Sequence, residues 1–329
     1  MNKKYLITGG SGFIGSAMIR RLVKDKDNHV VNIDKLTYAA NLESLSAIKN
    51  FKNYSFFKYD ICNFEKLNEV FINFQPEIII HFAAESHVDR SIFAPKNFME
   101  SNIIGTYNLL ELCRKHSENK NIIFHHISTD EVYGDIKDGL PSSEEDAYRP
   151  SSPYSSSKAA SDHLVRSWHR TYGIPIFITN CSNNFGLFQN KEKLIPKVIN
   201  NIINNKDIPV YGDGKQTRDW LYVDDHIDGI LKVIEKGSIG ETYNLGGNNE
   251  ITNIDLIKQI IELTNKLKNG SDKDLDRMMK LITYVKDRPG HDTRYAINNQ
   301  KVKSLGWKIK NTFQHNLEKT IKWYMNEEK

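Results

Sequence analysis

A glycine-rich turn between a short apolar strand and a helix constrains this chain more than any other feature of its sequence. Tyr5–Thr8 is the predicted strand, Gly9-Gly10-Ser11-Gly12-Phe13-Ile14-Gly15 the turn and Ser16–Lys24 the helix. The glycines satisfy both GxGxxG and GxxGxxG spacing. Such a turn lets a pyrophosphate approach the backbone at the N-terminus of a helix. The segment therefore predicts the first strand and helix of a dinucleotide-binding domain.

Short apolar runs alternate with longer amphipathic stretches through the first half of the chain. This alternation is typical of βαβ units and of a parallel sheet. We therefore expect an α/β fold, a Rossmann-type doubly wound parallel sheet with a smaller C-terminal substrate-binding lobe. The predicted strands are Tyr5–Thr8, Val30–Asp34, Tyr54–Tyr59, Ile78–Phe82, Ile122–Ile127 and Ile176–Asn180.

The pattern changes beyond Asn180, where Pro and Gly become more frequent and polar and aromatic residues mix. We expect residues 1–182, joined by roughly 225–250, to form the dinucleotide-binding domain. Residues 183–224 and 251–329 are expected to form the second lobe, with a helix over Leu256–Leu267.

The composition is that of an ordinary globular protein, with 39% hydrophobic and 26% charged residues and a net charge of +4. No Lys/Arg block favours nucleic acid, and no apolar run approaches the roughly 20 residues of a membrane helix. We expect neither nucleic acid nor a membrane as a partner. Cys62, Cys113 and Cys181 are scattered, and no signal-peptide pattern is present. These features predict a cytoplasmic location, without a disulfide framework or a metal site.

Two carboxylates lie at the ends of the second and third predicted strands. Asp34 lies about 20 residues beyond the glycines, where a carboxylate holds the ribose 2′-OH and repels a 2′-phosphate. The predicted cofactor is therefore NAD rather than NADP. Asp60 has two interpretations, an adenine-side contact or the N-cap of a helix over Asn63–Phe74.

Tyr154 and Lys158 form a YxxxK pattern in the predicted helix Tyr154–Tyr172. At positions i and i+4 both side chains lie on one face, and an ammonium near a phenol lowers the phenol pKa. Tyr154 is therefore a candidate base for a substrate hydroxyl. Together with the glycine-rich turn, this pattern resembles the short-chain dehydrogenase/reductase superfamily. The length and second lobe are similar to its extended, nucleotide-sugar branch.

Thr129, Asp130 and Glu131 come directly after the predicted strand Ile122–Ile127 and Ser128. Within a strand, adjacent side chains face opposite sides, but at its carboxyl end the chain turns and both carboxyls can reach one ligand. Adjacent carboxyls in a partly dry site raise the pKa of one of them, which supplies an acid and a base together. A solvated acidic turn or a helix cap is the alternative interpretation of the pair alone.

A narrower resemblance connects this segment with others along nearly the whole chain. The chain resembles the dTDP-glucose 4,6-dehydratase family in Ala83-Ala84-Glu85-Ser86-His87-Val88-Asp89-Arg90-Ser91, Thr129-Asp130-Glu131-Val132-Tyr133-Gly134, Tyr211-Gly212-Asp213-Gly214, Arg218-Asp219-Trp220 and Asp287-Arg288-Pro289-Gly290-His291. The resemblance implies an NAD-dependent hydro-lyase that oxidises C4 of dTDP-glucose, eliminates water across C5–C6 and returns the hydride to C6. The product is dTDP-4-dehydro-6-deoxyglucose, a precursor of deoxysugars such as rhamnose.

The resemblance also implies a role for each catalytic residue. Tyr154 takes the proton of the C4 hydroxyl, while Lys158 supports the tyrosine anion and the cofactor ribose. Thr129 binds the C4 oxygen, Glu131 removes the C5 proton, and Asp130 protonates the departing C6 hydroxyl.

The expected ligand contacts fall into two groups. The residues expected to bind the cofactor are Gly9, Gly12, Phe13, Ile14, Gly15, Asp34, Lys35, Asp60, Ile61, Phe82, Ala83, Ala84, Ser86, Ser101, Tyr154, Lys158 and Asn184. Those expected to bind the nucleotide sugar are Ser86, Asn183, Lys193, Leu194, Pro209, Tyr211, Arg218, Asn253, Arg288 and His291. Arg and Lys suit a diphosphate, and an aromatic neighbour suits a pyrimidine. Arg218 could instead pair with Asp219, and His291 could be a loop residue.

Several residues lie outside these expectations. His81, His125 and His126 are predicted to be structural because they lie in or beside strands, and the spacing of His87 and Asp89 assigns them no chemistry. The family commonly has Tyr-Gly-Pro where this chain has Phe185-Gly186-Leu187, which puts fine positioning in doubt rather than the reaction.

Other functions remain open at this stage. A 4-epimerase or decarboxylase would share Tyr154 and Lys158 but leave Asp130 and Glu131 idle. A dehydratase for a CDP-, UDP- or GDP-linked sugar would differ only in a few base contacts, and an NAD-binding protein without turnover would need neither carboxyl. For assembly, the resemblance implies a homodimer through the helices Asn97–His116 and Tyr154–Tyr172.

Overall fold

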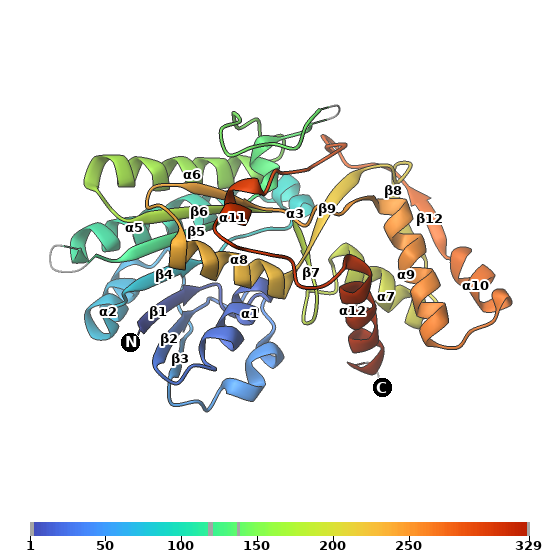
Figure 1. Cartoon of the computed structure of the whole chain (residues 1–329), viewed down its shortest axis with the longest axis horizontal. Coiled ribbons are helices and arrows are strands. Elements are labelled where there is room, and N and C mark those ends of the chain that lie inside the picture. Colours follow the sequence, from blue (N-terminus) through green and yellow to red (C-terminus); the bar gives the residue numbers. More distant parts are fainter. Residues whose placement is uncertain (1–2, 118–120, 137–138, 328–329) are drawn as a thin grey trace.

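The computed structural model describes residues 3–117, 121–136 and 139–327. Its centre is a seven-stranded sheet in the order β10-β6-β5-β4-β1-β2-β3, in which every pairing is parallel (Figure 1). This is the Rossmann order, with the reversal between β1 and β4. All six predicted strands are confirmed. The strands are β1 Lys3–Thr8, β2 Asn28–Ile33, β3 Tyr54–Phe57, β4 Ile78–His81, β5 Ile123–Thr129, β6 Ile176–Cys181 and β10 Thr242–Leu245.

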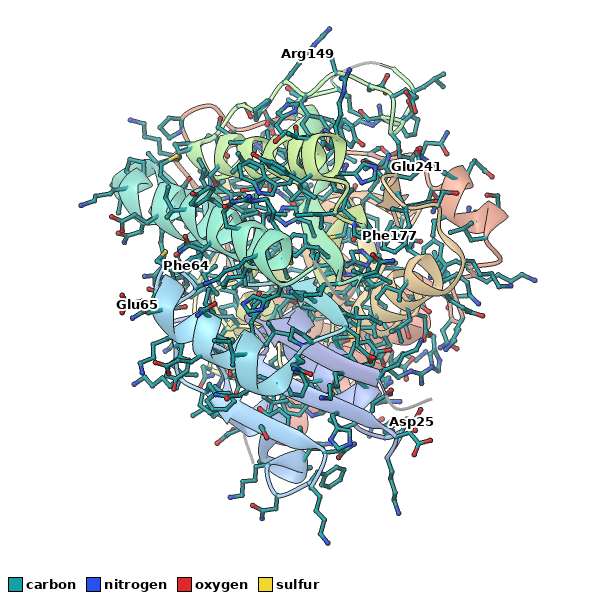
Figure 2. The ribbon with its side chains drawn as sticks, turned by 90° about the vertical axis from the view of Figure 1, so that its left-hand side faces the viewer. Asp25, Phe64, Glu65, Arg149, Phe177 and Glu241 are labelled. Carbon is teal, nitrogen blue, oxygen red and sulfur yellow. The ribbon has the colours of Figure 1, made fainter. Side chains whose placement is uncertain are left out.

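Helices cover both faces of this sheet. On one face α2, α5 and α6 enclose an apolar cluster around Leu6, Phe71, Leu110 and Phe124. On the other face α1 and α8 enclose a second cluster that includes Phe177, which Figure 2 labels between the layers. Strand β4 is buried on both faces, which explains why Ile78-Ile79-Ile80 lacks polar alternation. The helices are α1 Phe13–Leu22, α2 Phe64–Phe74, α5 Gly105–His116, α6 Pro153–Tyr172 and α8 Val223–Lys236.

The second lobe has its own apolar core, in which Phe185, Trp220, Ile257 and Leu317 take part. Two small sheets frame it, one in the order β11-β9-β7 and one formed by β12 and β8. Its strands are β7 Asn183–Phe185, β8 Ile208–Tyr211, β9 Thr217–Tyr222, β11 Glu250–Thr252 and β12 Ile282–Val285, and its helices are α7 Leu194–Ile203, α9 Asn253–Leu267, α10 Asp272–Met279 and α12 Phe313–Glu327.

The division into two domains stays a prediction, and one segment packs differently from it. The short helix α11 Gln300–Ser304 contacts β10 and α8, and Val302 and Trp307 are buried in the cluster around Phe177. This part of the range 251–329 therefore belongs with the first core. Residues 1–2, 118–120, 137–138 and 328–329 of the predicted ranges lie outside the described residues.

The segment predicted as one helix over Asn97–His116 is more varied in the structure. A short helix, α3 Val88–Phe93, is followed by α4 Pro95–Phe98, a π-helical stretch over Met99–Ile104 and then α5. π-helical turns often lie at functional sites, and this one carries Ser101 and Asn102. Across the described ranges, we find no helix with the length and apolarity to span a bilayer.

Candidate active site

A cavity of about 480 Å³ lies at the carboxyl ends of the central strands and reaches into the second lobe. Every residue predicted to act in catalysis, cofactor binding or substrate binding lines it, with the single exception of Asp60. The cavity is where open α/β sheets place their ligands, at the switch in strand order. The fold thus brings together side chains that are up to 282 positions apart, from Gly9 to His291.

The glycine turn leaves no space for side chains. Gly9 has a φ of 69°, and a Cβ there would lie 2.5 Å from the nitrogen of Ala83. A Cβ on Gly15 would lie 2.4 Å from the oxygen of Gly9. Helix α1 begins at Phe13, earlier than predicted, so Gly12 is its N-cap. A bare backbone at a helix N-terminus fits a pyrophosphate, and these residues therefore fit a bound dinucleotide.

Asp34 lies beside the glycine turn Gly9–Gly15, and we call the turn and this carboxylate together the cofactor cradle. One carboxylate oxygen accepts from the Ser11 backbone N–H at 2.9 Å and the other from that of Leu36 at 2.8 Å. Burial raises the pKa of Asp34, and the two backbone hydrogen bonds oppose the rise. The carboxylate position fits the ribose of NAD and would repel the extra phosphate of NADP.

Asp60 stands beside the cradle rather than in the cavity. Its carboxylate lies 3.5 Å from Lys35 Nζ and accepts from the backbone N–H of Cys62 at 2.9 Å. Lys35 Nζ also donates to Ser101 Oγ at 2.8 Å. The interpretation of Asp60 as a helix N-cap is wrong, because Asn63 caps α2 by accepting from the Lys66 backbone N–H.

Strand β5 ends at Thr129, two residues later than predicted, and Asp130–Tyr133 then form a 3₁₀ turn. The Thr129 hydroxyl donates to Asp130 Oδ1 at 3.2 Å. Burial, followed by the charge of Glu131, raises the pKa of Asp130 well above its usual value. Burial also raises the pKa of half-buried Glu131, but Arg218 and Lys193 oppose this rise. Asp130 therefore holds a proton more readily than Glu131, as an acid–base pair requires.

Tyr154 and Lys158 lie in the first turns of α6, which Ser152 caps through a reciprocal pair of hydrogen bonds with Ser155. Burial and the charge of Glu131 raise the pKa of Tyr154, while a hydrogen bond with Thr129 lowers it. Lys158 Nζ donates to the backbone oxygen of Ile127 at 2.8 Å, and burial lowers its pKa to about 8. The prediction of an acidic phenol is thus not met in this structure, where the net effect on Tyr154 is a rise.

Cationic and aromatic side chains line the lobe side of the cavity. Arg288 pairs with Asp89 and lies over the ring of Tyr211, with 4.3 Å between its guanidinium carbon and the ring centroid. Lys193 Nζ donates to the Ser86 backbone oxygen at 3.3 Å. His291 Nδ1 lies 2.7 Å from Asp287 Oδ1.

Arg218 does not form the alternative ion pair with Asp219. Its guanidinium donates to the backbone oxygens of Thr217 and Asp292, and it lies over the Tyr295 ring. Asp219 instead accepts from the backbone N–H groups of Gly247 and Asn249 at 2.7 and 2.6 Å.

Sequence reasoning missed several residues that line or support the cavity. Asn102 accepts from the Glu85 backbone N–H at 2.8 Å and donates to Ser157 Oγ at 2.8 Å. Asp162 stands behind Lys158, and its spacing of four residues from Lys158 was a signal that could have found it. Other missed lining residues are Glu85, His87, Asp89, Ser128, Asp292 and Tyr295.

The departure at Phe185 has a structural reason. Its side chain is buried against the rings of Trp220, Tyr222 and Phe313 in the core of the lobe. Leu187 packs against the same core. Neither Phe185 nor Leu187 is among the residues that line the cavity.

The comparisons with known proteins agree with this site. The family model of GDP-mannose 4,6 dehydratase matches residues 6–320. A dTDP-glucose 4,6-dehydratase of Escherichia coli is 51% identical, over 98% of this chain and 94% of the relative. That of Haemophilus influenzae is 49% identical, over 97% of both chains.

Solved structures give the same result. The dTDP-glucose 4,6-dehydratase of Bacillus anthracis, in complex with NAD, is 41% identical and superposes with a TM-score of 0.88 over 99% of this chain and 97% of its own. The enzyme of Streptomyces venezuelae, with NAD and dTDP bound, is 37% identical with a TM-score of 0.90 over 98% and 97% of the two chains. The chain therefore belongs to the dTDP-glucose 4,6-dehydratase family of the extended short-chain dehydrogenases/reductases.

Proposed function

We propose that this chain converts dTDP-glucose to dTDP-4-dehydro-6-deoxyglucose, with NAD held in the cradle of Gly9, Gly12, Gly15 and Asp34. The observation that carries the proposal is the carboxyl pair at the end of β5. Asp130 and Glu131 both line the cavity beside Thr129, and their surroundings favour the proton on Asp130. An epimerase has no use for a second acid and base at this position.

The chain's own residues can perform each proton movement. Bound NAD supplies reversible hydride acceptance, which allows C4 to be oxidised and C6 to be reduced later. The Tyr154 hydroxyl, once ionised, takes the proton of the C4 hydroxyl, and Thr129 orients the C4 oxygen. The Glu131 carboxylate then takes the C5 proton, which the neighbouring ketone makes acidic. As the C5–C6 double bond forms, Asp130 gives its proton to the departing hydroxyl and water leaves. When C6 is later reduced, Glu131 returns a proton to C5.

The lobe side of the cavity suits the nucleotide diphosphate. Arg288, Arg218 and Lys193 supply positive charge, and Arg can bind a phosphate through two parallel hydrogen bonds. Pro209 and Tyr211 of β8 line the cavity, with Tyr211 beside Arg288, and offer an apolar and an aromatic surface for the base. We assign the substrate contacts accordingly, together with Ser86, Asn183, Leu194, Asn253 and His291.

A mass measurement tests the assignment. The purified protein is incubated with NAD⁺ and, separately, with dTDP-glucose, UDP-glucose, CDP-glucose and GDP-mannose. The proposal predicts a product lighter by one water, formed from dTDP-glucose alone or fastest from it. Faster loss of water from another sugar nucleotide would move the assignment to that nucleotide. Unchanged masses in all four reactions would contradict a dehydratase and favour an epimerase, whose products are isobaric.

We also propose a homodimer through the adjacent helices α5 and α6. Three large side chains on or beside these helices are exposed, Ile104 at 49%, Tyr107 at 41% and Tyr172 at 51%. The ring of Trp168 stacks edge-on with both tyrosines, which gives the surface a continuous apolar centre. A monomeric mass in light scattering at micromolar concentration would contradict the dimer.

The state of the cysteines supports our proposal of a cytoplasmic location. Cys62, Cys113 and Cys181 are free thiols, and such thiols are typical of a reducing compartment. A cytoplasmic enzyme is the simplest interpretation, and fractionation of the source cells would test it.

A further inference from the structure

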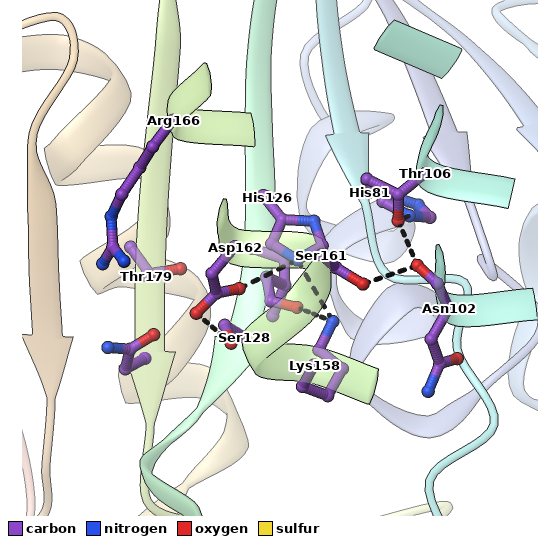
Figure 3. Close-up of polar contacts among 12 residues, drawn as sticks. His81, Asn102, Thr106, His126, Ser128, Lys158, Ser161, Asp162, Arg166 and Thr179 are labelled. Atoms are coloured by element: carbon purple, nitrogen blue, oxygen red, sulfur yellow. Dashed lines mark hydrogen bonds and ion pairs between the residues drawn. The ribbon is translucent and has the colours of Figure 1, made fainter. Parts of the chain in front are cut away.

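Three charged side chains follow one another on the face of α6 that covers β5. Lys158, Asp162 and Arg166 are four residues apart and therefore share a face of the helix. Opposite them, His126 of β5 has its Nε2 atom 3.3 Å from Lys158 Nζ and 3.2 Å from Asp162 Oδ1 (Figure 3). His126, Lys158 and Asp162 are all buried, so the charges of Lys158 and Asp162 interact without screening by water.

Asp162 is ionised in this setting. Its Oδ2 atom accepts from the hydroxyls of Ser128 and Tyr148, each at 2.9 Å. Burial raises the pKa of Asp162, but the hydrogen bond with His126 and the charges of Lys158 and Arg166 oppose burial, and the net pKa is lowered. A buried carboxylate is stable only with such partners. The ring of His126 lies between this carboxylate and Lys158.

His126 is neutral, and its single ring proton has a preferred position. Burial, followed by the charge of Lys158, lowers the pKa of His126 to about 4. Its Nδ1 atom has no hydrogen-bond partner among the described residues. A proton on Nδ1 would be a buried donor without an acceptor, although Nε2 could then accept from the Lys158 ammonium at 3.3 Å. A proton on Nε2 instead lies on the atom that is 3.2 Å from Asp162 Oδ1, and the negative charge of this carboxylate favours the Nε2–H tautomer.

Other titratable groups also lie around Lys158, His126 and Asp162. His81 of β4 has its ring 5.3 Å from that of His126, and burial keeps its pKa well below the usual value. Cys181 of β6 has a pKa raised by burial and is a thiol. Arg166 donates to the Tyr148 hydroxyl at 2.7 Å, so its charge faces the outer side of Asp162. Among these side chains, Asp162 is therefore the one that carries a negative charge.

We propose that Asp162, acting through His126, is a positioning residue whose charge keeps Lys158 protonated beside Tyr154. The proposal rests on the proposed function, in which Lys158 must be cationic to support the tyrosine anion. Burial alone drives the ammonium towards its neutral form, and Asp162 opposes this effect. Without that charge, Lys158 would lose its proton within the physiological pH range, and Tyr154 would lose its cationic neighbour.

The test is a titration of Lys158 by NMR of lysine labelled at Cε and Nζ, in protein as purified. The Lys158 signal is identified by its absence from Lys158→Arg. Asp162→Asn keeps the shape of the side chain and removes its charge. It is expected to lower the Lys158 midpoint by about one pH unit or more, as loss of a nearby opposite charge does. Tyr148→Phe is the matched control, because it removes a hydrogen bond to Asp162 but no charge, and its midpoint should stay near that of the wild type. Equal midpoints in Asp162→Asn and the wild type would overturn the proposal.

Kinetics supply a second readout that a merely structural role would not move. The alkaline limb of the kcat/KM profile should shift to lower pH in Asp162→Asn by the same amount as the NMR midpoint. A uniform loss of activity without a shift of the limb would contradict the proposal. The NMR midpoints are measured without substrate, so they test the role of Asp162 independently of the reaction. Failure of the wild type to dehydrate dTDP-glucose would contradict only the proposed function.

A measurement on the wild type covers the case in which Asp162→Asn does not fold. Nitrogen NMR of labelled histidine should show His126 neutral, with its proton on Nε2, from about pH 6 to 9. A proton on Nδ1 would overturn the proposal, because Nε2 could then accept from Lys158 but no longer donate to Asp162.

Discussion

Arg288 and Asp89 form a two-point ion pair inside the cavity, with Nε 2.6 Å from Oδ1 and a terminal nitrogen 3.0 Å from Oδ2. The two residues come from different parts of the chain, Asp89 from α3 and Arg288 from the loop after β12. The pair holds the guanidinium over the ring of Tyr211, with its carbon 4.3 Å from the ring centroid. A diphosphate that enters the cavity meets an arginine that is already oriented.

Replacing Arg288 by lysine should therefore weaken substrate binding more than chemistry. Lysine keeps the charge but cannot make two parallel hydrogen bonds, and we expect KM for dTDP-glucose to rise about tenfold with a smaller change in kcat. Steady-state kinetics measure both constants. Arg277→Lys on the exposed side of α10 is the control and should leave both unchanged. A loss confined to kcat would contradict the assignment of Arg288 to the diphosphate.

Removal of the Tyr154 hydroxyl should abolish most of the turnover. Tyr154→Phe is expected to lower kcat by about 10²- to 10⁴-fold, the usual contribution of a positioned general base. The matched control is Tyr284→Phe, since that ring lies on β12 and is 60% exposed. An unchanged kcat in Tyr154→Phe would remove the phenol from the mechanism.

The charge of Asp34 should decide between the two nicotinamide cofactors. Asp34→Asn removes the repulsion of a 2′-phosphate and one acceptor for the backbone of the cradle. We expect the preference for NAD⁺ over NADP⁺ to fall about tenfold, or about 1.4 kcal/mol. Calorimetric titration with each cofactor measures it. Asp27→Asn in an exposed turn should keep the wild-type ratio. If Asp34→Asn kept the wild-type preference for NAD⁺ over NADP⁺, residues other than Asp34 would determine the cofactor selectivity.

Buried histidines should make the fold sensitive to acid. Burial lowers the pKa of His125 and His226 to about 3 and that of His126 to about 4. The unfolded chain binds more protons than the folded one between these values and the ordinary histidine pKa. The free energy of unfolding should then fall as pH drops from about 6.5 to 4, by up to about 1.4 kcal/mol per pH unit for each histidine.

His226→Gln checks this dependence in urea titrations across the same pH range. This variant should reduce the slope of the free energy of unfolding against pH by up to about 1.4 kcal/mol per pH unit, the contribution of one histidine. His315→Gln, at an exposed position of α12, should keep the wild-type slope. A slope that is equal in both variants would show that His226 takes no part in the acid sensitivity.

The central sheet and most of the cavity could be predicted from the sequence because their signals are local. A buried parallel strand is a short apolar run, and the glycine turn needs Gly9 and Gly15 where no Cβ fits. The exact ends of the strands do not follow from such local signals. Strand β5 continues through Thr129 because its backbone still pairs with β6 there, a contact that no local pattern records.

The remaining features depend on contacts between distant segments. The Asp89–Arg288 pair joins residues 199 positions apart, and periodicity says nothing about such a pair. Trp307 returns to the first core because its indole N–H donates to the Asp225 backbone oxygen at 2.9 Å. His126 was expected to be only structural, since its role depends on which face of β5 lies under Lys158 and Asp162.

The most direct test of the central claim is the reaction of dTDP-glucose in D₂O, followed by mass spectrometry and NMR of the sugar. Wild-type protein should give a product that has lost one water and carries solvent deuterium at C5, because Glu131 removes the C5 proton before C6 is reduced. Asp130→Asn should slow the loss of water, and Glu131→Gln should form neither the product nor a C5-deuterated sugar. A wild-type product of unchanged mass, inverted at C4 and without deuterium at C5, would contradict dehydration and leave the carboxyl pair at the end of β5 without its proposed role.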